Sequence, residues 1–179
     1  MKDSNEKRQP PFGDKRLELL FEYWQDKRGD QDLPRRRDID PVEMGAELLP
    51  HVMLTEVLES GNRFRYRLAG TTIESVAGQS LSGAYIDELL VPPYLEYILG
   101  LYHQVIEERV AIYTESLYPA TGTQPERYTK RLMMPLRSAD DEIVMVLSGQ
   151  VFESASEFRP PRSFTNTPSA FKETVRLVL

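Results

Sequence analysis

The stretch 63–90 constrains the fold more than any other part of the chain, because its periodicity changes abruptly. Apolar side chains alternate with arginines over residues 63–68, and an alternation of period two is typical of a half-buried strand. The alternation stops at residues 69–70, and glycines at 78 and 83 divide the rest of the stretch into short segments, which indicates short helices and turns. A strand that leads into short helices predicts a concavity between sheet and helices, the kind of space where small molecules bind.

Five segments in all are predicted to be strands, and their order along the chain limits the topology. They are His51–Glu59, Arg63–Ala69, about Val110–Tyr118, Arg127–Arg137 and Ile143–Phe152. Short helices and one long helix, from Pro92 to near Glu108, are predicted between the second and third strands. Turn sequences at 121–123 and 140–141 would join the last three strands as hairpins, which favours an antiparallel sheet. The fold class is therefore α+β, with helices covering one face of the sheet.

A helical extension is predicted before the sheet. Asp14 is a suitable N-cap, and apolar residues recur at positions 17, 20, 21 and 24, on one face of a helix that should end near Gly29. A second, short helix should start at Asp40-Pro41. The first and fifth strands are apolar on both sides, so both faces of the sheet should be covered. The helix that contains Trp24, or a partner subunit, would cover the second face.

These patterns divide the chain into four parts. We expect a disordered N-terminus (1–13), the helical extension (14–48), a sheet-containing domain (49–152) and a C-terminal tail (153–179). The tail should end in a short helix that begins at Thr167-Pro168, because Phe171, Val175 and Val178 have helical spacing.

Composition excludes several classes of function. The 179 residues include no cysteine, which excludes thiol catalysis, disulfides and thiolate metal sites. The net charge of −6 argues against nucleic-acid binding, and the basic run Arg35–Arg37, which is bracketed by aspartates, is interpreted as solvated or ion-paired surface. No signal peptide and no membrane-length apolar run is present, so we expect a cytoplasmic protein without membrane contact. No phosphate-binding or nucleophile motif is present, so we expect no enzyme.

The order of elements resembles a PAS domain, and a set of segments resembles more narrowly the small bacterial PAS-like family of alphaproteobacteria designated PAS_5. The segments are LFEYWQDKRG (20–29), LPRRRDIDPVEM (33–44), LLPHVMLTEV (48–57), RFRYRLAGT (63–71), LSGAYIDEL (81–89) and KRLMMPL (130–136). The resemblance spans roughly residues 17–152. It implies a five-stranded antiparallel sheet with helices between the second and third strands. It also implies a role in sensing, ligand binding or protein association, and it brings no catalytic motif.

Side chains expected on the sheet and its helices form the predicted ligand-binding set. They are Tyr66, Ile73, Tyr85, His103, Tyr113, Met134 and Met145. Tyrosine offers an apolar ring with a hydroxyl that orients a ligand, and methionine adapts to irregular shapes. The alternative for each residue is that it simply fills the core. His103 with Glu107 provides only two ligands, too few for a metal site.

We therefore expect a non-catalytic, cytoplasmic sensory or regulatory module that binds a small ligand between sheet and helices and pairs as a homodimer. The dimer expectation rests on the strands that are apolar on both sides and on the apolar helix face from Leu17 to Trp24. One alternative is a protein-interaction adaptor with a filled core, and a partner protein is compatible with either. The other is a haem-binding PAS sensor that uses His103, because haem-binding PAS domains take their iron ligand from the corresponding helix. These patterns identify neither a cofactor nor the ligand.

Overall fold

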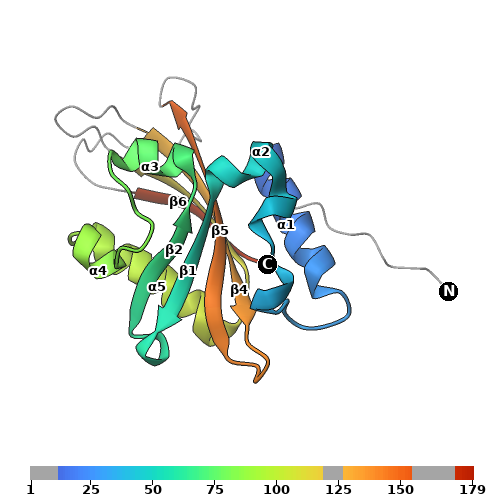
Figure 1. Ribbon diagram of the computed structural model, residues 1–179. Coiled ribbons are helices and arrows are strands. Elements are labelled where there is room, and N and C mark those ends of the chain that lie inside the picture. The colour runs from blue at the N-terminus through green and yellow to red at the C-terminus, as the bar shows by residue number, and fades with distance from the viewer. Residues whose placement is uncertain (1–11, 119–126, 155–171) are drawn as a thin grey trace.

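The computed structural model describes residues 12–118, 127–154 and 172–179 and is built around one antiparallel sheet (Figure 1). Its strands are β1 (Val52–Leu58), β2 (Arg63–Ala69), β3 (Ile112–Tyr118), β4 (Arg127–Arg137), β5 (Ile143–Ser154) and β6 (Lys172–Val178). The six strands are arranged in the order β2-β1-β5-β4-β3-β6. The first five confirm the predicted strands, and both strands that are apolar on two sides, β1 and β5, lie inside the sheet.

Three helices between β2 and β3 cover one face of the sheet. They are α3 (Thr71–Ala77), α4 (Ile86–Leu89) and α5 (Tyr94–Glu108). Apolar residues of α5 at helical spacing are buried toward the strands, among them Ile98, Leu101 and Val105. Burial of such a stripe supplies most of the stability of an amphipathic helix. These helices and the strand residues beneath them form one hydrophobic cluster.

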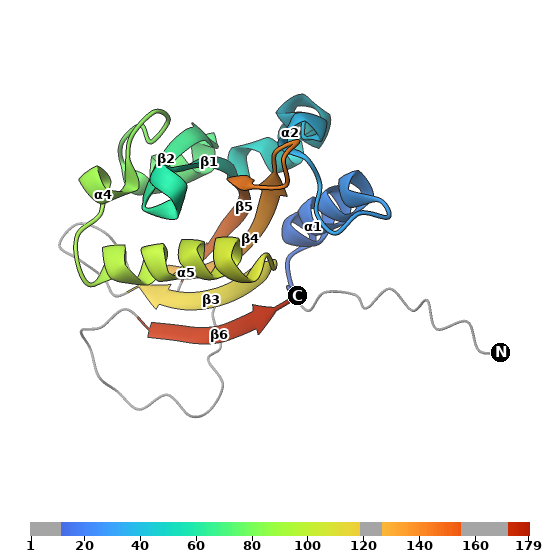
Figure 2. The ribbon, with the colours of Figure 1, turned by 90° about the horizontal axis from the view of Figure 1, so that it is seen from below.

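Helix α1 (Lys15–Arg28) covers the opposite face of the sheet, as Figure 2 shows. Asp14 caps the helix by accepting a hydrogen bond from the Arg16 N–H at 2.9 Å. The indole Nε1 of Trp24 donates to the Pro135 carbonyl at 3.1 Å. The predicted cover for the second face is therefore α1 of the same chain. Because its apolar face is buried against its own sheet, that face gives no support to a dimer.

Short helical turns connect the main elements. They are η1 (Arg36–Asp38), η2 (Pro41–Met44), α2 (Gly45–Leu48), η3 (Leu49–His51) and η4 (Glu59–Gly61). Asp40 caps η2 by accepting from the Val42 N–H at 2.9 Å, with Pro41 in the first turn. The predicted second helix start is thus confirmed, although the first turn has 3-10 geometry.

The C-terminal residues form a strand, so the predicted C-terminal helix is wrong where the structure describes it. β6 pairs antiparallel with β3, with Ile112 opposite Val178. Val175 and Leu177 lie against the cluster beneath α1, and this alternation suits a strand better than a helix. The available edge of β3 supplies backbone partners for the whole segment, which a short isolated helix would lack. The sheet therefore has six strands instead of five, and the predicted start of the helix lies outside the described residues.

Order at the N-terminus begins earlier than predicted. The segment expected to be disordered includes Phe12, but the side chain of this residue is fully buried. Its ring lies 4.8 Å from that of Tyr113 and 5.5 Å from that of Phe21. A single aromatic residue next to a polar segment can anchor the chain by filling a core position. Residues 1–11 lie outside the described part.

Candidate functional site

Polar side chains are buried on the sheet face that α3 and α5 cover. We call this set the polar band; its members are Thr55, Thr114, Ser116, Thr129, Arg131, Ser148 and Gln150. They come from four adjacent strands, β1, β5, β4 and β3. Since successive side chains of a strand point to opposite faces, their alternate positions place them on one side of the sheet. All seven are at most 6% exposed, which is unusual for polar residues.

Arg131 lies at the centre of the polar band. In the sheet register it stands directly opposite Thr114 of β3 on one side and Gln150 of β5 on the other. Its Nη2 donates to the Tyr94 hydroxyl on α5 at 2.9 Å, and the residue is 4% exposed. Arginine keeps its charge in proteins. The band therefore has a fixed positive charge with hydrogen-bonding side chains on both sides.

Two tyrosines of α5 contact the polar band from the helix side of the sheet. The Tyr102 hydroxyl lies 2.8 Å from Thr55 Oγ1, and the Tyr97 hydroxyl lies 3.2 Å from Ser116 Oγ. Burial raises the pKa of Tyr102 to about 12 and also raises the pKa of Tyr97. Both side chains are consequently neutral near pH 7, where each hydroxyl donates one hydrogen bond and accepts others.

The Thr129 hydroxyl has no hydrogen-bond partner among the residues that the structure describes, and the hydroxyls of Thr114 and Ser148 have only weak contacts with the Tyr97 and Tyr102 hydroxyls. A buried hydroxyl without a partner costs about 1–3 kcal/mol of stability, so one such hydroxyl beside two poorly satisfied ones calls for an explanation. A bound polar molecule would satisfy them. With the charge of Arg131, the arrangement suits a small ligand that carries hydrogen-bond acceptors.

Two of the predicted ligand-binding residues lie beside this band. Tyr66 of β2 stands opposite Thr55 of β1 in the register. Ile73 of α3 belongs to the same hydrophobic cluster as Tyr66 and is buried. They extend the polar band with apolar surface.

Two other predicted ligand-binding residues lie on the same side of the sheet but farther from the polar band. Tyr85 is half-buried, and the Arg63 guanidinium stacks 3.7 Å from the centre of its ring. His103 packs its ring 5.6 Å from that of Phe64, and its Nε2 hydrogen-bonds the Gly61 carbonyl at 3.1 Å. Since a carbonyl only accepts, this nitrogen carries a proton and is not free to coordinate iron.

The remaining three predicted residues, Tyr113, Met134 and Met145, are buried on the opposite face, in the cluster beneath α1. The Tyr113 hydroxyl donates to Glu115 at 2.6 Å and lies 3.0 Å from the Phe12 carbonyl. The sheet separates these residues from Tyr66, so the structure does not bring the predicted set together. The adjacent residue Met133, not Met134, faces α5.

The polar band is absent from the sequence-based prediction, although a signal for it exists. Three largely apolar strands carry polar residues two positions apart: 114 and 116, 129 and 131, 148 and 150. Such pairs share one face of each strand. Within the part of the chain that the structure describes, no group of three or more His, Asp or Glu could hold a metal ion.

A sequence model of the PAS domain family matches residues 14–150. The chain therefore belongs to the PAS domain family, a class of sensory modules, and its antiparallel sheet with helices between β2 and β3 agrees with that assignment. No curated protein matches the chain. None of the helices in the described ranges is long and apolar enough to cross a membrane.

Three solved structures show partial similarity. The light-state LOV domain of the blue-light photoreceptor Aureochrome1 has 16% identity and a TM-score of 0.42, covering 62% of this chain and 86% of that one. The Vibrio cholerae VqmA dimer has 13% identity and a TM-score of 0.45, covering 70% and 56%. A variant of Vivid has 12% identity and a TM-score of 0.46, covering 80% and 97%. We draw no functional conclusion from similarity at these levels.

Proposed function

We propose that this PAS domain is a non-catalytic cytoplasmic sensory module that binds a small ligand in the polar band, between the sheet and α5. The observation that carries the proposal is the buried Arg131 with Thr114 and Gln150 in register on its two sides. A carbonyl or carboxylate would find a charged donor there, and such charge-assisted hydrogen bonds are about twice as strong as neutral ones.

The surroundings of Arg131 favour a ligand over a purely structural role. The hydroxyl of Thr129 is buried without a partner among the described residues, and that of Ser148 has only a weak contact with Tyr102. A polar network that is only partly satisfied is less stable than an apolar core. Ligand oxygens would supply the missing partners. Tyr66 and Ile73 would contact the apolar part of the same ligand.

A signal could leave the site through β6. The Tyr97 hydroxyl lies near Ser116 in the band and also donates to Glu173 of β6 at 2.7 Å. Glu173 pairs with Arg176 at 2.9 Å, and Arg176 donates to Gln104 of α5 at 2.9 Å. A ligand that engages Ser116 or Tyr97 would compete with these contacts and weaken the attachment of β6.

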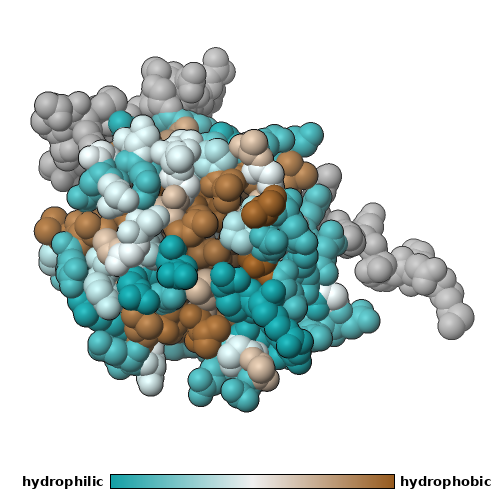
Figure 3. Space-filling model, in the orientation of Figure 1, coloured by the Kyte–Doolittle hydropathy of each residue, from teal (hydrophilic) through white to brown (hydrophobic). Residues whose placement is uncertain are grey.

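We also propose that the chain pairs as a homodimer, through the outer edge of β6. β6 is an outer strand of the sheet, and an outer strand offers backbone groups to a second chain. Val178 and Leu179 at its end are 53% and 40% exposed. The face in Figure 3 instead carries separate apolar patches among hydrophilic residues. Sedimentation of the full chain at micromolar concentration tests the proposal, and a single monomeric species would contradict it.

Native mass spectrometry of the freshly purified full chain tests ligand binding. We expect excess mass over the 20.6 kDa chain that disappears on denaturation. Arg131→Gln should lose this mass, whereas Arg67→Gln should keep it, because Arg67 is exposed on β2. Absence of excess mass in the wild type, with no rise in melting temperature on addition of a metabolite extract, would favour the adaptor with a filled core.

A further inference from the structure

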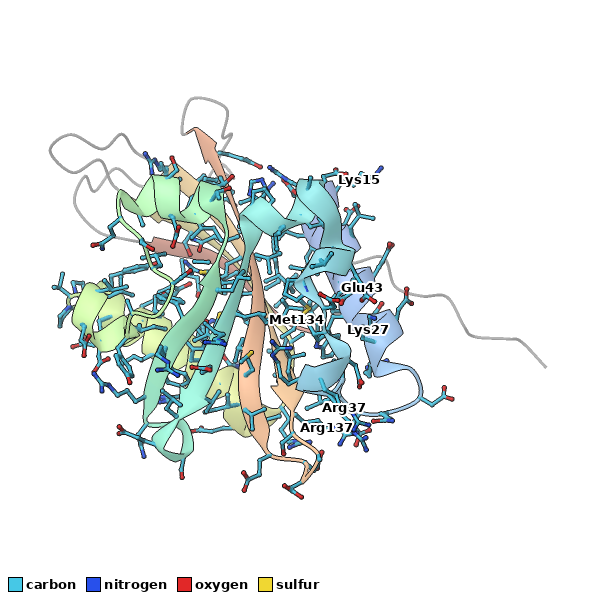
Figure 4. All side chains as sticks on the ribbon, viewed as in Figure 1. Lys15, Lys27, Arg37, Glu43, Met134 and Arg137 are labelled. Atoms are coloured by element: carbon cyan, nitrogen blue, oxygen red, sulfur yellow. The ribbon has the colours of Figure 1, made fainter. Side chains whose placement is uncertain are left out.

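Four arginines line a groove on the surface, near the end of β4. The groove has a volume of about 310 Å³ and is lined by Arg35, Arg36, Arg37, Arg137, Ser138, Ala139 and Val144. We call it the arginine groove. Figure 4 shows Arg37 and Arg137 side by side at the end of β4. The sequence pattern alone indicates only a solvated or ion-paired basic run at 35–37.

The fold builds the groove by pairing two distant segments. Arg35 and Arg137 form an isolated parallel β-bridge, and the Arg137 N–H donates to the Pro34 carbonyl at 3.1 Å. This pairing adds a fourth arginine to the run at 35–37. It also places the turn after β4 beside the run, and this turn contributes Ser138.

Two of the arginines are held in position mainly by neutral acceptors. Arg36 donates to the Ile39 carbonyl at 3.0 Å and to the Met145 sulfur at 2.9 Å. Arg137 donates to the Leu33 carbonyl at 3.1 Å and to Gln31. Hydrogen bonds to neutral acceptors orient a guanidinium without cancelling its charge. These two side chains are preorganised and remain cationic.

The acidic residues nearby form ion pairs with only two of the four arginines. Arg37 and Asp38 are 3.6 Å apart, as are Arg137 and Asp141. Asp141 lies closer to Arg109, at 2.9 Å, and so is shared between two arginines. Asp140 and Glu142, in the same turn, are exposed. Arg35 and Arg36 therefore form no ion pair with a carboxylate among the described residues.

Arg35 supplies an independent indication of a ligand. Its Nε is buried and has no hydrogen-bond partner, and no other hydrogen bond or ion pair of its side chain occurs within the described ranges. Buried donors without acceptors are rare in proteins, and one on a charged group is costly. An anion in the groove would give the Arg35 guanidinium a charged partner.

We propose that the arginine groove binds the phosphate group of a small soluble molecule. Phosphate oxygens accept paired hydrogen bonds from guanidinium groups, and a dianion is attracted more strongly by Arg35 and Arg36 than a singly charged carboxylate is. Ser138 Oγ accepts from the N–H groups of Asp140 and Glu142 at 3.1 and 3.3 Å, which leaves its hydroxyl proton to donate. Ala139 and Val144 offer apolar contact to the organic part.

Calorimetric titration of the full chain with phenyl phosphate, inorganic phosphate and benzoate tests the proposal. Phenyl phosphate combines a dianion with a small apolar body, while benzoate carries a single charge. We expect saturable 1:1 binding of phenyl phosphate with Kd about 1 mM or lower, and binding of benzoate about tenfold weaker or more. Lack of saturation with phenyl phosphate, or equal binding of benzoate, would overturn the proposal.

Variants separate a defined site from general attraction of anions. Arg35→Gln should weaken phenyl phosphate binding by about tenfold or more. Arg37→Gln, whose side chain is 71% exposed, should also weaken it without any effect on folding. Arg67→Gln makes the same change in net charge at an exposed position on β2 and should leave binding unchanged. Equal weakening by Arg37→Gln and Arg67→Gln, or no effect of Arg35→Gln in folded protein, would overturn the proposal.

The test is independent of the ligand site in the polar band. Arg131→Gln should leave phenyl phosphate binding unchanged, because Arg131 does not line the arginine groove. Loss of binding in Arg131→Gln as well as in Arg35→Gln would place the anion in the polar band and overturn the assignment to the groove.

Discussion

Gly149 of β5 lies directly against Leu20 of α1, so closely that a Cβ on residue 149 would come within 2.6 Å of Leu20 Cδ2. The same Cβ would lie 2.8 Å from Leu17 Cδ2. The absence of a side chain at this point lets α1 pack tightly on the second face of the sheet. The position of the helix therefore depends on one strand residue as well as on its own apolar stripe.

Gly149→Val is expected to destabilise the protein by about 1–3 kcal/mol, because added methyl groups overpack a closely fitted interface. Urea unfolding followed by circular dichroism measures the change. Gly100→Ala is the control: nothing lies within 4 Å of the added Cβ, and replacing a helical glycine by alanine should stabilise by about 0.5–1 kcal/mol. A Gly149→Val protein as stable as the wild type would show that α1 is not packed as described.

Phe12→Ala is expected to cost about 3 kcal/mol of unfolding free energy, since truncation of a fully buried phenylalanine removes apolar burial and leaves a cavity. Denaturant unfolding gives the value. Val42→Ala, at a position 82% exposed, should change stability by less than about 0.5 kcal/mol. If both substitutions had the same small effect, Phe12 would not be part of the core.

Deletion of residues 172–179 is expected to expose the outer edge of β3. Amide hydrogen exchange should become faster in β3, because its backbone partners on one side are lost. Exchange in β1, which pairs with β2 and β5, should change much less and serves as the internal reference. Unchanged protection of β3 would argue against β6 as a sixth strand.

Asp14 is expected to make stability depend on pH in the acid range. Burial raises the pKa of Asp14, but hydrogen bonds and the charge of Arg16 outweigh burial, so the pKa lies below its ordinary value of 3.8. A carboxyl whose pKa is lowered by folding adds stability above the unfolded-state pKa, and this stability is lost as pH falls through the folded-state pKa. The free energy of unfolding should thus decrease as pH falls below 3.8.

Asp14→Asn separates the charge from the helix cap, because asparagine also caps well. Urea unfolding at a series of pH values should show a smaller acid loss for this variant than for the wild type. Asp26→Asn removes an exposed carboxylate from the same helix and is the charge-matched control. Parallel pH profiles for the two variants would contradict a specific role of Asp14.

Local patterns predict most of the fold correctly. The alternation in 63–68, the cap at Asp14 and the apolar positions 17, 20, 21 and 24 of α1 each depend on residues close in sequence, so their structural meaning does not require knowledge of the rest of the chain. The C-terminal strand is different, because the apolar positions of residues 172–178 are compatible with helical spacing as well as with alternation, and pairing with β3 decides for a strand.

The candidate sites depend on packing that no local pattern contains. β4 carries apolar residues at both 133 and 134, so its periodicity does not say which of them faces α5. The predicted ligand-binding set is divided between the two faces for this reason. The arginine groove likewise exists only because Arg137 pairs with Arg35, about a hundred positions earlier in the chain.

The sequence by itself determined the type and order of the main elements, the PAS-like class and the absence of cysteine chemistry, because these depend on composition and short-range periodicity. Only the tertiary structure decided which face of each strand meets α5 and which meets α1. It also decided that Thr114, Arg131 and Gln150 form one row. Cross-strand register sets these neighbours, and register depends on how all strands and helices pack together.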